Sequence, residues 1–257
     1  MGAARLYEPA AGPGPLWRVD AARTLFVGPL DYNAPHQHGA PVFLSSLGGP
    51  FGVRIADGPW RACEAAMVPA GVVHELRVGM DPIAVLYVEP SVAGADAFRP
   101  LMRDVEETGA ALVGRSNVIS LVRRLHEDRD SAAWAGEALD DVLDFGGRRA
   151  RRSIDPRVAA AIGLLEANDR LSLADAALAV SLSPSRLQHL FAEEAGVPFR
   201  RYRAWTRMRR AIGAVIGGAN LTEAAHAAGF SDQPHFAHDF RRTFGAPASF
   251  SLTGVRR

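Results

Sequence analysis

The pattern of hydrophobic positions changes along the chain, and its first section is typical of β structure. Between residues 16 and 90, short runs rich in β-branched and aromatic residues alternate with Gly, Pro and Asp-Gly turn signals. Such alternation indicates strands joined by tight turns. The runs are TLFVG, PVFLSSL, FGVRI, AAMVP and IAVLYVEP. We therefore expect an all-β sandwich or small barrel in residues 1–93.

Helical spacing replaces this pattern from residue 94. In SNVISLVRRLHED the apolar residues step by three and four, as one buried face of a helix requires. SAAWAGEALDDVLDF has the same spacing. Residues 94–147 are therefore expected to be a helical linker. The apolar stripe of its first helix consists of Val118, Leu121, Val122 and Leu125.

A hinge is predicted at GGRRARRS, residues 146–153, because a glycine pair and four arginines cannot build a core. A new helix then begins in IDPRVAAAIGLLEAN, with Asp155 as N-cap and Pro156 at the first helical position. Residues 148–257 are thus predicted to be a separate all-α domain. The whole chain is expected to be an α+β protein of two domains.

An internal repeat lies beyond this hinge. LADAALAVSLSPSRLQHLFAEEAGVP (173–198) aligns with LTEAAHAAGFSDQPHFAHDFRRTFGAP (221–247), with one residue added in the turn of the second copy. Each copy indicates an alanine-faced helix, a tight turn and a second helix, capped by the hydroxyl of Ser183 or Ser231. The sequence therefore predicts two helix-turn-helix units. Matched pairs are Ala176/Ala224, Ala177/Ala225, Ala179/Ala227, Leu187/Phe236, Phe191/Phe240, Gly196/Gly245 and Pro198/Pro247.

These residues resemble the DNA-binding domain of the AraC/XylS family of transcription regulators, including the long helix between the two units. The resemblance implies that the second helix of each unit enters the major groove of double-stranded DNA. A glutamine there can make a bidentate pair with adenine. The base-reading positions implied by the family are Ser185, Gln188 and His189 in the first unit, and Gln233, Ala237 and His238 in the second.

Arginines beside these positions are expected to contact phosphates, which position a protein without reading sequence. They are Arg186, Arg241 and Arg242. From residue 148 onward the chain has 17 Arg against 9 Asp and Glu, a charge of about +8, whereas residues 1–147 carry about −7. A polyanion partner is therefore expected for the second domain alone. His235 joins this predicted surface, because a metal site with His238 would lack a third ligand.

Three histidines form a second candidate site in the β region. APHQHGAPVF contains His36 and His38, and MVPAGVVHEL ends its Pro-x-Gly-x-x-His pattern at His74. Histidines two apart on a strand point to the same face, and a third on a partner strand completes a set of imidazoles for a divalent metal. These stretches resemble the two cupin motifs, and a cupin-like sensing domain is common at the N-terminus of AraC-family regulators. The alternative is that they are ordinary loop histidines.

The resemblance to cupins is incomplete. The cupin site normally adds a glutamate after the histidine pair, where this chain has Val42 and Phe43, and Cys63 replaces the glycine that opens the second motif. Three imidazoles remain suitable for zinc, nickel or iron. Glu75 is interpreted as a surface acid and Cys63 as a packed residue. Candidates for the wall of a ligand pocket are Trp17, Trp60, Phe43, Phe51 and Tyr87.

Composition agrees with a cytoplasmic protein. A single cysteine excludes an internal disulfide framework. No run approaches the roughly 18 apolar residues of a membrane span, and the N-terminus MGAARLYEPAAGPGPLW does not resemble an export signal.

Together the resemblances imply a transcription regulator whose operator binding responds to a small-molecule effector or metal, with RNA polymerase as a further partner. The family also implies a homodimer through the stripe at residues 118–125, unless these helices only cap the barrel. Two alternatives remain: a metal-dependent cupin enzyme, of isomerase or dioxygenase type, that carries a DNA-binding domain, and constitutive DNA binding with an empty barrel.

Overall fold

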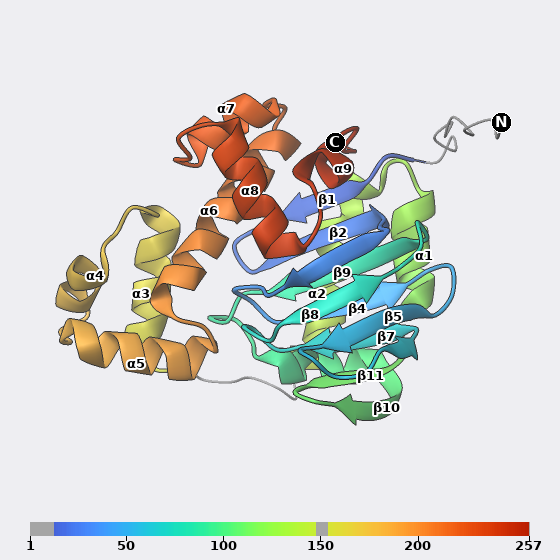
Figure 1. Cartoon of the computed structure of the whole chain (residues 1–257), viewed down its shortest axis with the longest axis horizontal. Helices are drawn as coiled ribbons and strands as arrows, with labels where there is room; N and C mark the ends of the chain where they lie inside the picture. Colours follow the sequence, from blue (N-terminus) through green and yellow to red (C-terminus); the bar gives the residue numbers. More distant parts are fainter. Residues whose placement is uncertain (1–12, 148–153, 257) are drawn as a thin grey trace.

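Two antiparallel sheets face each other in the N-terminal domain, and an all-helical domain follows (Figure 1). The computed structural model describes residues 13–147 and 154–256. The larger sheet has the strand order β1-β2-β9-β4-β7-β11-β10, and the smaller has the order β3-β8-β5-β6. The strands are β1 Leu16–Val19, β2 Arg23–Pro29, β3 Tyr32–His36, β4 Val42–Ser46, β5 Phe51–Ile55, β6 Arg61–Cys63, β7 Ala65–Val68, β8 His74–Arg77, β9 Pro82–Val88, β10 Met102–Thr108 and β11 Ala111–Ser116.

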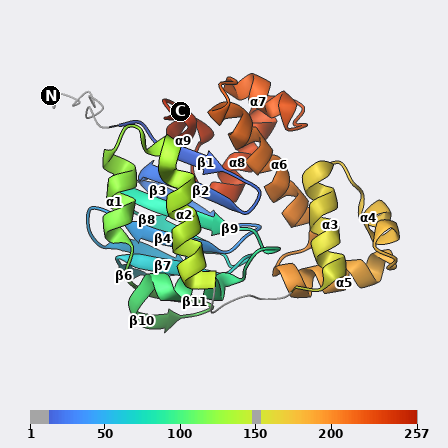
Figure 2. The same cartoon turned by 180° about the vertical axis from the view of Figure 1, so that it is seen from behind.

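The larger sheet is buried on both faces. Along β4, Val42 and Leu44 point into the core between the sheets, whereas Phe43 points into a second core on the outer face. Two helices, α1 Ile119–Glu127 and α2 Ser131–Gly147, and the 3₁₀ helix η1 Ala95–Leu101 cover that outer face (Figure 2). Burial on both sides explains why β9 is almost continuously apolar rather than alternating.

The sequence predicted a helical linker in residues 94–147, but this region is only partly helical. Residues 102–116 form the hairpin β10–β11, which completes the larger sheet at one edge. The turn contains Gly109 at φ +58°, a backbone conformation that glycine adopts readily. Only Met102 of β10 is buried, so this strand has no alternation of apolar and polar residues to mark it in the sequence. The prediction that the β domain ends at residue 93 was therefore wrong.

The apolar stripe of α1 packs inside the chain. Val122 and Leu125 are buried, and Val118 and Leu121 pack against the outer core with part of their surface exposed. The structure thus agrees with the capping alternative for this helix, and most of the stripe is unavailable to a second copy.

The helical domain contains the two predicted helix-turn-helix units. Its helices are α3 Pro156–Ala167, α4 Leu173–Ala179, α5 Pro184–Ala195, α6 Phe199–Ile216, α7 Leu221–Ala227, α8 Gln233–Phe244 and α9 Ala248–Leu252. Helices α4 and α5 form the first unit, and α7 and α8 form the second. The predicted cap at Asp155 is confirmed, since its side chain accepts from the Arg157 N–H. The predicted hinge begins inside α2, and residues 148–153 lie outside the described part of the chain.

Helix α6 joins the two units and lies against the β domain. Its buried face includes Tyr202 and Trp205. The second unit lies over the open end of the sheets, with α8 next to β3, whereas the first unit lies farther out (Figure 1). No helix in the described ranges is long and apolar enough to cross a membrane.

Candidate functional site

The two helices predicted to read DNA present their polar residues to solvent. In α5, Leu187, Leu190 and Phe191 are buried, and in α8 the buried residues are Phe236, Phe240 and Phe244. All nine residues predicted to contact DNA are exposed. They are Ser185, Arg186, Gln188, His189, Gln233, His235, His238, Arg241 and Arg242.

The N-terminal caps of these helices differ. Ser183 caps α5, accepting from the Arg186 N–H at 3.2 Å, as predicted. In α8 the predicted cap Ser231 is wrong by one residue: Asp232 accepts from the His235 N–H at 2.7 Å, and the Ser231 hydroxyl lies 3.0 Å from His235 Nδ1. The extra residue of the second turn therefore moves the cap by one position.

The predicted residues of α8 lie on two sides of the helix. Gln233, His238 and Arg241 border one shallow hollow. His235 and Arg242 border a different cleft, formed with α6. At about 100° per residue, Gln233 and Arg242 lie about 180° apart. The structure therefore brings Gln233, His238 and Arg241 together but separates Arg242 and His235 from them.

The three predicted histidines of the β domain meet between the two sheets. His36 lies at the end of β3, His38 in the following loop and His74 at the start of β8. Their ligand atoms all lie within 4.8 Å of one another, and all three side chains are buried. Residues 36 and 74 are register partners across the β3–β8 ladder, which explains how residues distant in the sequence converge.

The hydrogen bonds of two imidazoles leave their other nitrogens free. His36 Nδ1 lies 2.7 Å from the carbonyl of Ala34, and His74 Nδ1 lies 3.0 Å from the carbonyl of Val72. Carbonyls only accept, so both rings must carry the proton on Nδ1 and a lone pair on Nε2. His74 Nε2 and His38 Nδ1 are buried without a partner among the described residues. This arrangement, with a backbone carbonyl fixing the tautomer, is common in metal-binding histidines.

Burial keeps these imidazoles neutral. It lowers the pKa of His74 to about 4. It also lowers the pKa values of His36 and His38 well below the usual value, and neighbouring histidines add to the effect. Neutral imidazole is the form that binds a metal.

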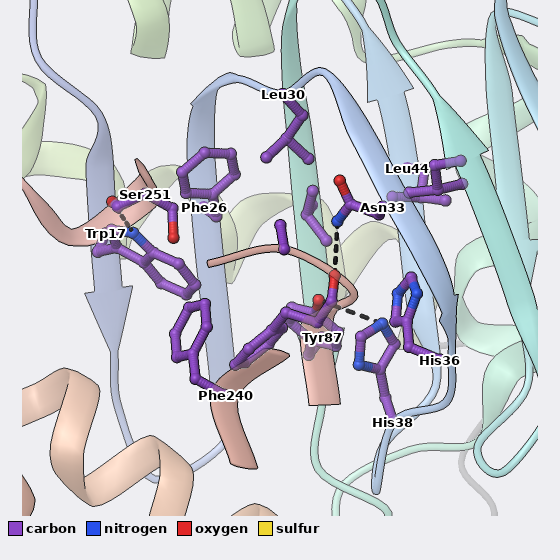
Figure 3. Close-up of a pocket in the computed structure, with 14 residues that line it drawn as sticks. Trp17, Phe26, Leu30, Asn33, His36, His38, Leu44, Tyr87, Phe240 and Ser251 are labelled. Carbon is purple, nitrogen blue, oxygen red and sulfur yellow. Dashed lines mark hydrogen bonds between the residues drawn. The ribbon is translucent and has the colours of Figure 1, made fainter. Parts of the chain in front are cut away.

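A small cavity of about 30 Å³ lies beside His36 and His38 (Figure 3). That volume holds one or two water molecules. The predicted wall residues Trp17 and Tyr87 line it, and the Tyr87 hydroxyl lies 3.4 Å from His38 Nε2. Three other predicted wall residues, Phe43, Phe51 and Trp60, do not line it.

The helical domain supplies part of this cavity's wall, which the sequence did not predict. Phe240 and Phe244 of α8 line the cavity. The Phe244 ring lies 5.7 Å from the His38 ring and 6.1 Å from the Tyr87 ring, between centroids. The C-terminal end of α8 therefore fills the space that a ligand of the β domain would need.

Two hydrogen bonds fix this end of α8 to β3. The Ala34 backbone N–H donates to the Gly245 carbonyl at 2.9 Å, and the Asn33 side-chain amide donates to the Phe244 carbonyl at 2.6 Å. A Cβ at Gly245 would lie only 2.5 Å from the Ala34 carbonyl oxygen and 2.7 Å from His36 Nδ1. The close approach of the two domains thus requires glycine here.

A buried ionic cluster holds α6 to the β domain. Glu89, directly after β9, accepts from the Tyr202 hydroxyl at 2.5 Å and from the Trp205 indole N–H at 3.0 Å, and pairs with Arg209 at 3.1 Å. Arg209 also donates to the Thr24 hydroxyl at 3.0 Å. Burial raises the pKa of Glu89, and Arg209 acts in the opposite direction. In the sequence Glu89 is a single acid at the end of a strand, and nothing there predicts its ion pair with Arg209.

Two other predictions concern the side chains near the histidines. Glu75 is not a surface acid: it is buried on the opposite face of β8 from His74, where Tyr32 and Arg54 bind its carboxylate. Cys63 is buried and unpaired, and burial raises the pKa of its thiol to about 12. Among the described residues, neither belongs to the histidine cluster.

Comparison with known proteins supports the fold of both domains. Residues 176–250 match the family described as a helix-turn-helix domain. That match does not extend to the β domain, so its resemblance to cupins stays a prediction. None of the curated proteins matches the chain by sequence.

Two solved structures of ToxT, from Vibrio cholerae, resemble nearly the whole chain. ToxT from strain SCE256, with an unsaturated fatty acid bound, has 15% identity and a TM-score of 0.62, covering 93% of this chain and 99% of that chain. ToxT from strain O395, bound to (E)-4-(8-methylnaphthalen-1-yl)but-3-enoic acid, has 13% identity and a TM-score of 0.60, covering 91% and 99%. The chain therefore has the same two-domain fold.

Proposed function

Residues 176–250 form a helix-turn-helix domain of AraC type, and on this premise we propose that the chain is a sequence-specific transcription regulator whose β domain controls DNA binding. The observation that carries the proposal is the duplicated unit, with both reading helices exposed along their polar sides. Gln188 and Gln233 read bases, and Arg186 and Arg241 contact phosphates. The protein acts as a binding switch rather than as an enzyme.

Contact between the two domains supports control of DNA binding by the β domain. Phe244 and Gly245 of the second reading helix lie against β3 and the histidine cluster, so a change in the β domain reaches α8 directly. An effector shifts such an arrangement only when it binds the docked and undocked states unequally. A ligand that replaces Phe244 in the cavity favours the undocked state.

Two kinds of effector fit this site. ToxT binds an unsaturated fatty acid in one structure and a naphthalenyl butenoic acid in another, and the apolar cavity here, lined by Trp17, Phe26 and Leu44, suits a hydrophobic ligand once Phe244 has moved. The other is a divalent metal, namely zinc, nickel or iron.

The histidine cluster fits a metal. Zinc–nitrogen bonds of about 2.0–2.1 Å in a tetrahedral site require nitrogens roughly 3.4 Å apart, so side-chain movements of about 1 Å would bring the three imidazoles to that spacing. His36 and His74 would bind through Nε2, and His38 through its unpartnered Nδ1. A metal here would tie β3, β8 and the loop after β3 together.

Elemental analysis tests the metal. After dialysis against zinc, we expect one bound ion per chain in the wild type and none in H74A, because two imidazoles hold zinc weakly. H226A, which removes an exposed histidine of α7, is the control and should keep the ion. Equal, near-zero metal in wild type and H74A would remove the metal from the proposal.

Selection of duplexes from a random pool tests the regulator itself. The full chain should enrich one sequence with two half-sites about one helical turn apart. Retention of no duplex above background at low salt would contradict the proposal, whatever the metal result.

Two partners extend the proposal on family grounds. We propose a homodimer and contact with RNA polymerase. Because the stripe of α1 packs inside the chain, the dimer would use another surface.

The enzyme alternative is supported by the open coordination positions that three imidazoles would leave on a metal. A screen for turnover of cupin-type substrates by the metal-loaded chain distinguishes an enzyme from a regulator, because a sensor domain releases its ligand unchanged.

A further inference from the structure

An arginine-rich cleft lies where α6, α8 and the loop after β3 meet. Its volume is about 560 Å³, within the range of about 300–1,000 Å³ typical of small-molecule sites. Gln37 and Gly39 of the loop form one wall, and α6 and α8 form the others. The cleft does not share its lining with the histidine cavity. We refer to it as the arginine cleft, because its lining includes Arg200, Arg201, Arg203, Arg207 and Arg242.

The charge of the arginine cleft is not balanced within the described chain. Asp239 is its only lining carboxylate there, and it pairs with His235 at 3.6 Å. Among described residues, none of the five guanidinium groups has a carboxylate within ion-pair distance.

Two of these arginines show that the unbalanced positive charge is energetically unfavourable. Burial, together with the charges of Arg242 and Arg200, lowers the pKa of Arg201. Arg207 buries its Nε and one Nη without a hydrogen-bond partner in the described residues. Arg203 donates to the Leu171 carbonyl at 3.1 Å, and the Arg207 guanidinium lies 4.2 Å from the centre of the Phe230 ring, so the partners of these two groups are uncharged. Guanidinium groups that line one cavity without a carboxylate partner are suited to bind phosphate or carboxylate oxygens.

The arginine cleft and the base-reading side of α8 are separate. Arg242 lines the cleft, whereas its neighbour Arg241 borders the hollow shared with Gln233 and His238. A duplex read by Gln233 would therefore lie on the other side of this helix. The cleft instead faces the loop that carries His38.

We propose that the arginine cleft binds a small multivalent phosphate anion, as a second ligand site distinct from both the DNA surface and the histidine cavity. An anion held by Arg201 and Arg242 would join α6 to α8. Because Gln37 and Gly39 line the same space, it would also stabilise the docked position of the β domain. The proposal concerns a ligand that the domain match does not imply, and it does not depend on the identity of the effector in the cavity.

Calorimetry with inorganic pyrophosphate tests the site. We use the full chain in metal-free buffer, with sodium chloride matched for ionic strength. The wild type should bind one pyrophosphate per chain with saturation, and R201Q should weaken binding by at least about tenfold, as expected for loss of a charge-assisted hydrogen bond. R201Q should fold, because removing a repelled, half-buried charge relieves the repulsion; a thermal melt checks this.

R241Q is the matched control. It removes the same charge from the other side of α8, next to Arg242, and should leave pyrophosphate affinity within about twofold, since only general screening changes. Equal weakening by R201Q and R241Q would show diffuse attraction to a basic domain and overturn the proposal. Absence of saturable binding by the wild type would also overturn it.

Competition with DNA separates a free phosphate ligand from the phosphate backbone of a duplex. R201Q should bind the selected duplex as the wild type does, whereas R241Q should bind it more weakly. If a duplex displaces pyrophosphate and R201Q weakens both ligands by the same factor, the arginine cleft is a DNA-backbone contact and the proposal is wrong. Failure of the regulator proposal would leave the pyrophosphate result unaffected.

Discussion

The two helix-turn-helix units are copies in sequence and backbone, yet they are held differently by the β domain. Their first helices have 7 residues each and their second helices 12. Both second helices end at a left-handed glycine, Gly196 at φ +75° and Gly245 at φ +74°. Both glycines also lie close to the β domain, Gly196 beside Gly71 and Gly245 beside Ala34. The duplication thus preserves a docking point.

What differs is the residue just before each glycine. The first unit has Ala195 and the second has Phe244, at the repeat offset of 49. Ala195 is buried within the α-helical core, whereas Phe244 reaches the aromatic and histidine side chains of the β domain. One large side chain therefore accounts for much of the difference. Under the proposed function, the second unit is the one through which the β domain would act on DNA binding.

Replacing Phe244 by alanine should produce the largest effect, because it makes the second unit resemble the first. Loss of a buried phenylalanine costs about 3–5 kcal/mol, and here the loss falls on docking. Trp17 and Trp205 both contact the ring, so their fluorescence should shift to the red as the cavity opens. Urea denaturation followed by tryptophan emission measures both changes.

F236A is the control for that experiment. Phe236 is fully buried in the same helix but contacts Phe230 and Phe240 rather than the β domain. It should lower stability by a similar amount without the red shift in the native state. A native spectrum of F244A identical to that of the wild type would show that the second unit is not docked through this ring.

The sequence was sufficient for the duplicated units but not for their docking. Caps, turn residues and apolar spacing act within a dozen residues, so they show in a local pattern, as at Ser183 and Asp155. The convergence of His36, His38 and His74 was also predictable, because a motif and strand alternation place them on one face. The β10–β11 hairpin was missed because its polar strand lies at a sheet edge.

Contacts between the domains lie beyond such patterns. Glu89 and Arg209 are 120 residues apart and meet only because α6 crosses the end of β9. Phe244 follows the helical spacing of Phe236 and Phe240, which is typical of the buried face of a helix. Its position facing His38 comes from the tertiary arrangement. Neither residue type nor spacing distinguishes a phenylalanine that packs in the helical core from one that contacts the β domain.

Replacing each capping glycine by alanine also compares the two units, and the expected loss of stability is smaller than for F244A. G196A should cost about 1–2 kcal/mol, because alanine resists the left-handed conformation, and its Cβ would otherwise meet only ordinary contacts at 3.4 Å. G245A carries the same strain and also an overlap with Ala34 and His36. Overpacking adds about 1–3 kcal/mol.

Thermal melts of the two variants, compared with the wild type, measure this difference. We expect G245A to be the less stable and to show the same red-shifted native emission as F244A, while G196A keeps the wild-type spectrum. Equal destabilisation, with unchanged spectra in both, would mean that the approach of Gly245 to β3 contributes nothing beyond helix capping.

The smallest expected effect concerns the reading residues themselves. The Thr222 hydroxyl donates to Gln233 Oε1 at 3.0 Å, whereas the repeat position of Thr222 in the first unit is Ala174. Gln233 is therefore oriented before DNA arrives. At the repeat offset of 49 its counterpart in the first unit is Pro184, and Gln188 corresponds to Ala237, so the first unit has no equivalent pair. Each glutamine is expected to contribute about 1–3 kcal/mol of base discrimination, and T222A should remove about 0.5–1.5 kcal/mol, the usual contribution of one hydrogen bond.

Binding to duplexes altered in one half-site at a time distinguishes the two units. Q188A should relax discrimination in one half-site and Q233A in the other, with T222A weakening only the half-site that Q233A affects. A174T adds a hydroxyl at the equivalent place in the first unit, opposite Pro184 rather than Gln188, so it is the control and should leave discrimination by Gln188 unchanged. If T222A weakened both half-sites equally, the support would act on the stability of the domain rather than on Gln233, and the two units would read DNA alike despite their different attachment to the β domain.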